Sequence, residues 1–222
     1  MAIFFIYILA AYLIGSIPTA IWYGKFFHKT DIRKHGSGNA GATNTIRTFG
    51  KLAGFIVLFI DIAKGYIAVH LAPLIYGIVF FESGNNPDSF HPVLWMQYPV
   101  LVWGLAAALG HIYPIYEKFK GGKGVATLLG VLIALYFTFP LLSALGIFVL
   151  MFVLTKRVSI GSILSGVAFA VAFIVLQYNI MLVADYIVIC LYPLLIMYTH
   201  RSNIMRLING TEPRMSLGKK KI

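Results

Sequence analysis

The stretch that decides the fold is residues 125–155, VATLLGVLIALYFTFPLLSALGIFVLMFVLT. It contains 31 residues without a charge, has Pro140 near its middle and ends at Lys156–Arg157. A helix crosses a bilayer core in about 20 residues, so this stretch is long for one span and short for two. We predict two short crossings with an outer turn at residues 138–140, because Lys156–Arg157 then faces the cytoplasm as the positive-inside rule requires. One tilted crossing is the alternative.

The rest of the chain shows the same alternation of apolar stretches and basic segments. The other apolar stretches are 2–24, 52–80, 93–114, 160–177 and 186–199. All Lys and Arg residues except Lys64 fall in the segments 25–51, 118–123, 156–157 and 201–221. If these segments share the cytoplasmic side, the protein is all-α with about seven transmembrane helices, its N-terminus outside and its C-terminus cytoplasmic. A six-span arrangement would place the N-terminus inside.

Composition supports a polytopic membrane protein with a single domain over residues 1–222. Apolar residues make up 59% of the chain and charged residues 11%, whereas soluble proteins have about a quarter charged residues. The formal net charge of +11 therefore reflects the positive-inside bias and attraction to anionic headgroups or a phosphorylated substrate, not nucleic acid. The single Cys190 excludes an internal disulfide and a Cys-based zinc site. We predict no metal and no cofactor.

The first glycine-rich loop, residues 36–47, reads GSGNAGATNTIR. Closely spaced glycines allow positive φ angles and let successive backbone N–H groups point into one concavity, which suits an anion. Several side chains here also donate hydrogen bonds, so we predict a phosphate site; a flexible interfacial loop is the plain alternative. The predicted phosphate-binding residues are Ser37, Gly38, Asn39, Asn44 and Arg47.

The second glycine-rich loop, residues 119–127, reads FKGGKGVAT and leads into an apolar stretch. A glycine-rich turn before a helix N-terminus offers free N–H groups and a partial positive charge, to which Lys123 adds a full charge. The loop lacks the P-loop spacing G-x-x-x-x-G-K-[ST], so ATP binding is not expected. The predicted phosphate-binding residues are Gly121, Gly122, Lys123 and Gly124.

The histidine segment, residues 200–212, reads HRSNIMRLINGTE. In a helix leaving the membrane, His200, Asn203, Leu207 and Thr211 would share one face. A lone histidine at the membrane surface is commonly structural, but Asn203 on the same face favours contact with substrate.

Two smaller polar groups accompany the apolar stretches. Asp61 and Lys64 are three residues apart inside one of them, where charges are costly and usually paired, so we predict a structural ion pair; contact with the site is the alternative. Ser159 follows Lys156–Arg157 at a predicted helix start, where it could cap the helix or bind phosphate.

In this order and at this spacing, the three segments resemble the bacterial glycerol-3-phosphate acyltransferases that use acyl phosphate as donor. The resemblance covers nearly the whole chain and includes Gly-Ser-Ile-Pro at 15–18 and the Lys64-Gly65 pair. Residue 40, often Pro in that family, is Ala40 here, which we expect to loosen the first glycine-rich loop slightly.

The resemblance implies an enzyme of the bacterial inner membrane with its active site at the cytoplasmic face. Its reaction would transfer an acyl group from acyl phosphate to the 1-hydroxyl of sn-glycerol 3-phosphate, giving lysophosphatidic acid and phosphate, as the first acylation of phospholipid synthesis. Its partners would be these substrates and membrane lipid, and it would act as a monomer. The implied catalytic residues are Ser37, Arg47, Lys123, His200 and Asn203, with Glu212 as structural support.

Chemistry leaves the proton acceptor open. Acyl phosphate is a mixed anhydride with a good leaving group, so the protein needs to orient the alcohol and stabilise developing charge, without supplying a covalent nucleophile. Either His200 or a substrate phosphate oxygen could accept the hydroxyl proton, and a covalent acyl-Ser37 is a third route. We favour the substrate phosphate, because the sequence places no Asp or Glu to orient His200 as in a triad.

Two other classes of protein compete with an enzyme. A secondary transporter should show two-fold repetition and a midplane site, but the halves of this chain show no repeat. A scaffold protein with a polybasic tail would explain Lys219–Lys221 but not the two glycine-rich loops.

Overall fold

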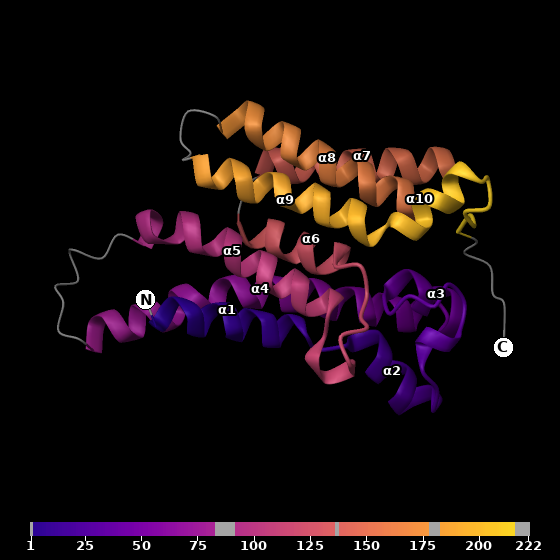
Figure 1. Cartoon of the computed structure of the whole chain (residues 1–222), viewed down its shortest axis with the longest axis horizontal. Coiled ribbons are helices and arrows are strands. Elements are labelled where there is room, and N and C mark those ends of the chain that lie inside the picture. The colour runs from indigo at the N-terminus through magenta and orange to yellow at the C-terminus, as the bar shows by residue number, and fades with distance from the viewer. Residues whose placement is uncertain (1, 83–91, 136–137, 178–182, 216–222) are drawn as a thin grey trace.

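The computed structural model describes residues 2–82, 92–135, 138–177 and 183–215, and in these ranges it contains helices and no strands (Figure 1). The α-helices are α1 (Ala2–Gly15), α2 (Thr19–His28), α3 (Ala42–Phe49), α4 (Lys51–Glu82), α5 (Pro92–Ile112), α6 (Val125–Ala134), α7 (Thr138–Thr155), α8 (Val158–Gln177), α9 (Val183–Thr199) and α10 (Arg201–Ile208). Two short 3-10 helices are η1 (Ile32–Lys34) and η3 (Ile115–Glu117).

The long helices form two groups with α6 between them. Helices α7, α8 and α9 lie together in one group, and α1, α4 and α5 lie in the other (Figure 1). One buried apolar cluster joins the groups, with Leu101 of α5, Val131 of α6, Phe169 of α8 and Ile189 of α9 among its members. The short helices α2, α3 and α10 lie at one end of this bundle, where the basic segments also gather (Figure 1).

Glycines bring helix pairs into backbone contact. A Cβ atom at Gly15 of α1 would lie 2.0 Å from the carbonyl oxygen of Ala107 on α5, and one at Gly130 of α6 would lie 1.9 Å from that of Ile62 on α4. Close approach through small residues is how helices associate where lipid removes the hydrophobic driving force. The same contact holds α6, and with it the loop that precedes α6.

Length and composition make this a multi-pass membrane protein. Among the described residues, five helical segments are long and apolar enough to cross a bilayer: Phe5–His28, Lys51–Leu71, Val100–Glu117, Thr138–Thr155 and Val158–Leu176. Val125–Ala134 and Tyr186–Thr199 are shorter apolar helices. Large apolar side chains face outward, as with Phe59 at 73% exposure, which suits contact with lipid. Seven spans and the side of each terminus stay predictions.

The predicted first span, residues 2–24, corresponds to the candidate span Phe5–His28, but it is two helices and not one continuous helix. The chain breaks between Gly15 and Thr19, because Pro18 has no N–H and disfavours helical conformation in the residue before it. Within the break, the carbonyl of Ile17 accepts hydrogen bonds from the N–H of Thr19 at 3.0 Å and from the ammonium of Lys64 at 2.8 Å. Asp61 accepts from Thr19 Oγ1 at 2.9 Å.

Asp61 and Lys64 form the predicted ion pair. Their charged atoms are 2.9 Å apart, and their side chains are 2% and 3% exposed. Neither residue lines the cavity described below. Their contacts with Ile17 and Thr19 show that the pair closes the broken end of α1.

The decisive stretch 125–155 is divided, but unevenly. Helix α6 has 10 residues and α7 has 18, so only α7 is long enough to be one of the five candidate spans. The predicted turn at residues 138–140 is misplaced: these residues form the first turn of α7, where Pro140 is tolerated because no intrahelical N–H bond is needed there. Residues 136 and 137 lie outside the described ranges.

Candidate active site

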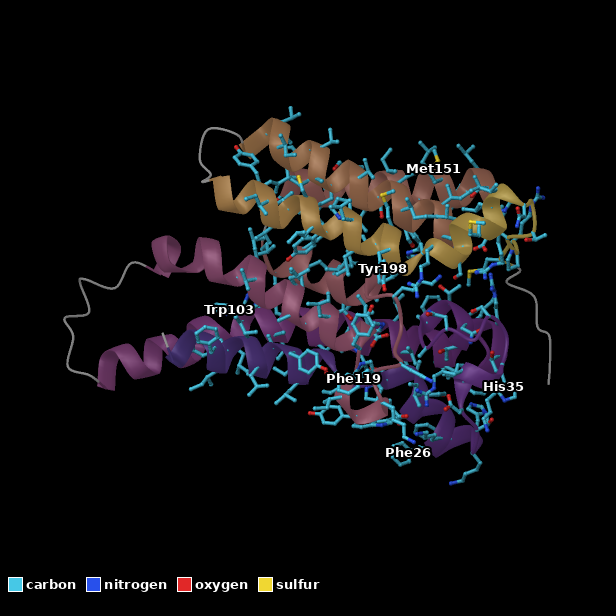
Figure 2. All side chains as sticks on the ribbon, in the orientation of Figure 1. Phe26, His35, Trp103, Phe119, Met151 and Tyr198 are labelled. Atoms are coloured by element: carbon cyan, nitrogen blue, oxygen red, sulfur yellow. The ribbon has the colours of Figure 1, made fainter. Side chains whose placement is uncertain are left out.

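A cavity of about 350 Å³ opens where the three predicted segments meet. The first glycine-rich loop contributes Ser37, Gly38 and Asn39, and the second contributes Phe119 through Lys123. Thr199, Arg201, Ser202 and Arg206 line it from the end of α9 and from α10. Figure 2 shows nitrogen-bearing side chains gathered at this end of the bundle, with Phe119 and Tyr198 nearby on different elements. The cavity therefore combines cationic and apolar walls.

Asn44 shapes the first glycine-rich loop from inside. Its side chain is buried; Oδ1 accepts from the N–H of Ser37 at 2.8 Å, and Nδ2 donates to the carbonyls of Ile32 and His35. The N–H of Gly38 donates to the carbonyl of His35. The N–H groups of Ser37 and Gly38, which the sequence suggested for anion binding, are thus used within the loop. Asn44 does not line the cavity.

The second glycine-rich loop is also held by its own backbone. The N–H groups of Gly121 and Gly122 donate to the carbonyls of Ile112 and His111 at the end of α5, at 3.0 and 3.1 Å. These carbonyls need partners because a helix end leaves them unsatisfied. A Cβ at Gly122 would lie 2.2 Å from His111 Nε2, so this position needs glycine for close packing. Free N–H groups at Gly121 and Gly122 were therefore a wrong expectation.

Side chains from two segments meet at Lys123. Its ammonium hydrogen-bonds Asn203 Oδ1, and Asn203 Nδ2 donates to Glu212 Oε1 at 2.7 Å. Burial lowers the pKa of Lys123 to about 8; the charges of Arg206 and Arg47 act in the same direction, and the Glu212 carboxylate acts against them. Lys123 is therefore a partly desolvated cation held at the cavity wall, which strengthens its attraction for an anion.

Glu212 binds three donors at once. Ser159 Oγ and Asn203 Nδ2 each donate at 2.7 Å, and Arg206 Nε donates at 2.8 Å. These hydrogen bonds hold the pKa of Glu212 below its usual value, against the opposing effect of burial. The Ser159 hydroxyl is buried in this contact and does not line the cavity. In the structure, Ser159 therefore holds Glu212 in place and does not face the cavity.

His200 lies behind the cavity wall, not in it. It precedes α10, is 3% exposed, and its Nδ1 lies 2.8 Å from the carbonyl oxygen of Ile196, to which Nδ1–H donates. This bond leaves Nε2 as the acceptor nitrogen. Burial, with the positive charge of Lys123, lowers the pKa of His200 to about 4, so the imidazole is neutral near pH 7.

The remaining predicted residues do not line the cavity. Arg47 is half-buried, and its guanidinium lies 3.4 Å from the carbonyl oxygen of Pro213, next to Glu212. Gly124 has a φ of 81° and precedes α6, which explains the need for glycine there. The helix predicted for the histidine segment ends at Ile208, so Thr211 lies beyond it, while His200 and Asn203 are both buried.

Several cavity residues were not singled out from the sequence. Ile112, Tyr113, Phe119 and Tyr198 form the apolar wall, and Arg201 stacks on Tyr198 with its guanidinium carbon 4.6 Å from the ring centre. Tyr198 and Tyr113 lie in apolar stretches that look like ordinary membrane helix. No group of three His, Cys, Asp or Glu side chains in the described ranges is arranged to hold a metal ion.

Comparison with known proteins identifies the family. A family model described as glycerol-3-phosphate acyltransferase matches residues 5–210. Glycerol-3-phosphate acyltransferases of Bacillus cytotoxicus and Enterococcus faecalis are 43% and 42% identical; the matches cover 99% and 96% of this chain and 99% and 92% of theirs.

Solved structures agree with the sequence relatives. Crystal structures of PlsY, an integral membrane glycerol 3-phosphate acyltransferase, match with TM-scores of 0.80 for the glycerol 3-phosphate form and 0.77 for the lysophosphatidic acid form. Their sequence identities are 35% and 34%, and each match covers 96% of both chains. The fold and its relatives define an integral membrane acyltransferase. The chain belongs to the glycerol-3-phosphate acyltransferase family.

Proposed function

We propose that this enzyme transfers an acyl group from acyl phosphate to the 1-hydroxyl of sn-glycerol 3-phosphate. The observation that carries the proposal is a desolvated Lys123, held by Asn203, at the wall of a cavity that also has an apolar side. A water-soluble phosphate monoester and an acyl phosphate with its chain in lipid both fit such a boundary. Glycerol 3-phosphate is also named for the crystallised relative.

The cationic wall is the proposed phosphate site. Lys123 supplies a charge-assisted contact, and Ser37 and Asn39 line the cavity from the other loop. Arg47 and Arg206 add positive charge nearby, since both lower the pKa of Lys123. Backbone groups contribute less than the sequence suggested, because those of Ser37, Gly38, Gly121 and Gly122 are already bonded.

The apolar wall is the proposed place for the start of the acyl chain. Ile112, Tyr113 and Tyr198 lie at the ends of membrane helices, and Phe119 is 55% exposed beside the cavity. An acyl carbonyl held here would sit between the lipid phase and the cationic wall. This arrangement brings the alcohol and the carbonyl together, which is a large part of catalysis when the leaving group is already good.

The reaction needs one proton transfer. The glycerol 1-oxygen forms a bond to the acyl carbon, the bond from that carbon to the phosphate oxygen breaks, and the phosphate leaves with the electron pair. We propose that a substrate phosphate oxygen takes the hydroxyl proton. A phosphate monoester with a second pKa of about 6 is a stronger base than an imidazole with a pKa of about 4. His200 is buried between Thr199 and Arg201, which line the cavity, and in this proposal its Nε2 accepts a hydrogen bond from a substrate hydroxyl.

The setting of the enzyme follows from the same proposal. We propose seven spans with the cavity at the cytoplasmic face of the bacterial inner membrane, where glycerol 3-phosphate is dissolved. The loops without Lys or Arg would then face outward and the basic segments inward. One copy of the chain carries every proposed contact, so a monomer suffices.

The test is a donor comparison with purified protein in lipid nanodiscs. Palmitoyl phosphate with glycerol 3-phosphate should give lysophosphatidic acid and one phosphate per product, with or without magnesium. Palmitoyl-CoA in place of palmitoyl phosphate should give no product. Product formation from palmitoyl-CoA but not from palmitoyl phosphate would overturn the proposed donor.

A further inference from the structure

Arg33 connects the first basic segment to the turn that precedes Lys123. It lies in η1, whose start is capped by Asp31: Oδ1 accepts from the N–H of Arg33 at 2.9 Å. The guanidinium also donates to Asp31, from Nε at 3.0 and 3.1 Å and from the second terminal nitrogen at 2.7 Å. One face of the guanidinium is therefore fixed by its own segment before it contacts another.

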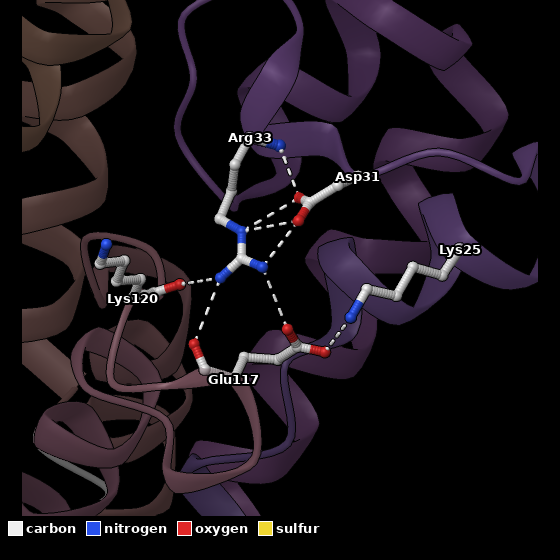
Figure 3. Close-up of polar contacts among 5 residues, drawn as sticks. All are labelled: Lys25, Asp31, Arg33, Glu117 and Lys120. Carbon is white, nitrogen blue, oxygen red and sulfur yellow. Dashed lines mark hydrogen bonds and ion pairs between the residues drawn. The ribbon is translucent and has the colours of Figure 1, made fainter.

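The other side of the guanidinium binds the turn formed by residues 117–120 (Figure 3). It donates to the backbone carbonyls of Glu117 at 3.2 Å and Lys120 at 3.0 Å, and to the Glu117 carboxylate at 3.0 Å. Lys25 holds the other carboxylate oxygen of Glu117 at 2.6 Å. The planar, five-donor fork of arginine makes such simultaneous contacts, and the single ammonium of lysine does not.

The turn needs this support because its backbone is strained. Lys118 and Phe119 have φ angles of 57° and 59°, in the left-handed region that non-glycine residues rarely adopt. Such conformations are costly and persist only where the surrounding structure holds them in place. Both carbonyls that Arg33 binds flank this strained pair. Lys123 follows Lys120, the last residue of this turn, by three positions.

We propose that Arg33 is a positioning residue for phosphate binding, which acts by holding the strained turn so that Lys123 is presented to the cavity. Arg33 itself does not line the cavity, so it does not contact the substrate. The inference rests on the proposed function only in taking Lys123 as a phosphate ligand. Loss of the hydrogen bonds from Arg33 should let the turn relax and move Lys123. A misplacement of about 1 Å can lower the reaction rate about a hundredfold.

The first experiment measures glycerol 3-phosphate affinity by calorimetry and KM by phosphate release. Arg33→Gln should raise both the Kd and the KM for glycerol 3-phosphate roughly tenfold or more. Arg33→Lys should fall between wild type and Arg33→Gln. Lys34→Gln is the matched control: it removes a neighbouring positive charge that is exposed and has no hydrogen bond or ion pair in the structure, and both constants should stay within about twofold.

A second variant separates positioning from folding. Glu117→Gln keeps an oxygen for Arg33 but removes the charge that binds both Arg33 and Lys25, so the Kd should rise by a smaller factor than in Arg33→Gln. If Arg33→Gln does not fold, Arg33→Lys and Glu117→Gln carry the test. Affinities within about twofold of wild type in both folded variants would overturn the inference.

A double-mutant cycle with Lys123→Met tests how Arg33 acts. In that background the ammonium is absent, so Arg33→Gln should raise the Kd by less than about threefold. An equal factor in both backgrounds would show that Arg33 does not act through Lys123. Turnover of palmitoyl phosphate by the wild type tests the proposed function separately, because the calorimetric readout needs no donor.

Discussion

The Lys123 ammonium hydrogen-bonds the side-chain oxygen of Asn203, although 80 residues separate the two in sequence. This contact joins the second glycine-rich loop to the histidine segment. Asn203 also donates to Glu212, so two hydrogen bonds link the cation at the cavity wall to a carboxylate that does not line the cavity. The predictions below start from this chain of contacts.

Lys123 should set the alkaline limit of glycerol 3-phosphate use. Its pKa is lowered to about 8, so kcat/KM should fall as the pH rises through about 8, when the ammonium loses its proton and its charge. The arginine of Lys123→Arg stays protonated, so the alkaline fall in kcat/KM of this variant should move above pH 10, even if its activity is lower. The measurement is kcat/KM for glycerol 3-phosphate from pH 6 to 10. An unchanged limb in Lys123→Arg would assign it to another group.

His200 should prove helpful but not obligatory. If it orients a hydroxyl, His200→Gln should retain measurable turnover and His200→Ala should lose more, because Gln still offers a hydrogen-bonding group. The acid limb of kcat/KM should stay near pH 6 in His200→Gln, since it follows the second ionisation of the substrate phosphate. Equal loss in both variants would instead make His200 the obligatory base.

Glu212 should act on both stability and affinity. Glu212→Ala removes the acceptor of Ser159, Asn203 and Arg206, and should lower the free energy of unfolding by about 2–4 kcal/mol. It should also weaken glycerol 3-phosphate binding, because Asn203 no longer has a fixed orientation toward Lys123. Thermal unfolding and calorimetry measure the two effects. Ser159→Ala is the control, with a loss of about 1 kcal/mol. Wild-type affinity in Glu212→Ala would separate Glu212 from the site.

The buried ion pair should be costly to break from one side. Lys64→Met leaves the Asp61 carboxylate without its nearest cation, and should destabilise the protein by about 3–5 kcal/mol. Asp61→Asn in the Lys64→Met background should recover part of that loss, because Asn still accepts from Thr19. The measurement is the free energy of unfolding of the wild type, Lys64→Met and the double variant in the same detergent. A double variant no more stable than Lys64→Met would show that the carboxylate is not the source of the cost.

Topology can be tested by single-cysteine labelling in a Cys190→Ala background. Cysteines at Lys34, Lys156 and Arg214, all exposed, should react with an impermeant maleimide only after the membrane is opened. A cysteine at Ser89, which lies between the apolar stretches 52–80 and 93–114 and outside the described residues, should react in intact cells, because this segment has no Lys or Arg. Labelling at residue 156 in intact cells would reduce seven spans to six.

Much of the site was visible in the sequence because it consists of local, unusual segments. The glycine-rich loops and the histidine segment stand out from apolar surroundings, and all three contribute to one cavity. The hydrogen bonds within and between these segments could not be predicted from the sequence. The N–H groups of Gly121 and Gly122 were expected to be free, but they donate to the last carbonyls of α5. The side chain of Asn44 was expected to bind phosphate, but it hydrogen-bonds the backbone of its own loop. The hydrogen-bond partners of a loop depend on which helix end packs against that loop in the folded protein.

Hydropathy and charge by themselves determined a multi-pass helical membrane protein, since apolar length and the placement of Lys and Arg are properties of the chain alone. The contact that closes the broken end of α1 and the contacts of Arg33 with residues 117–120 were decided only by the tertiary structure. Each depends on groups that meet across different helices: Lys64 at the broken end of α1, and Arg33 at the turn before Lys123. Sequence patterns report the period and polarity of a segment, whereas hydrogen-bond partners far apart in the chain are chosen when the helices pack.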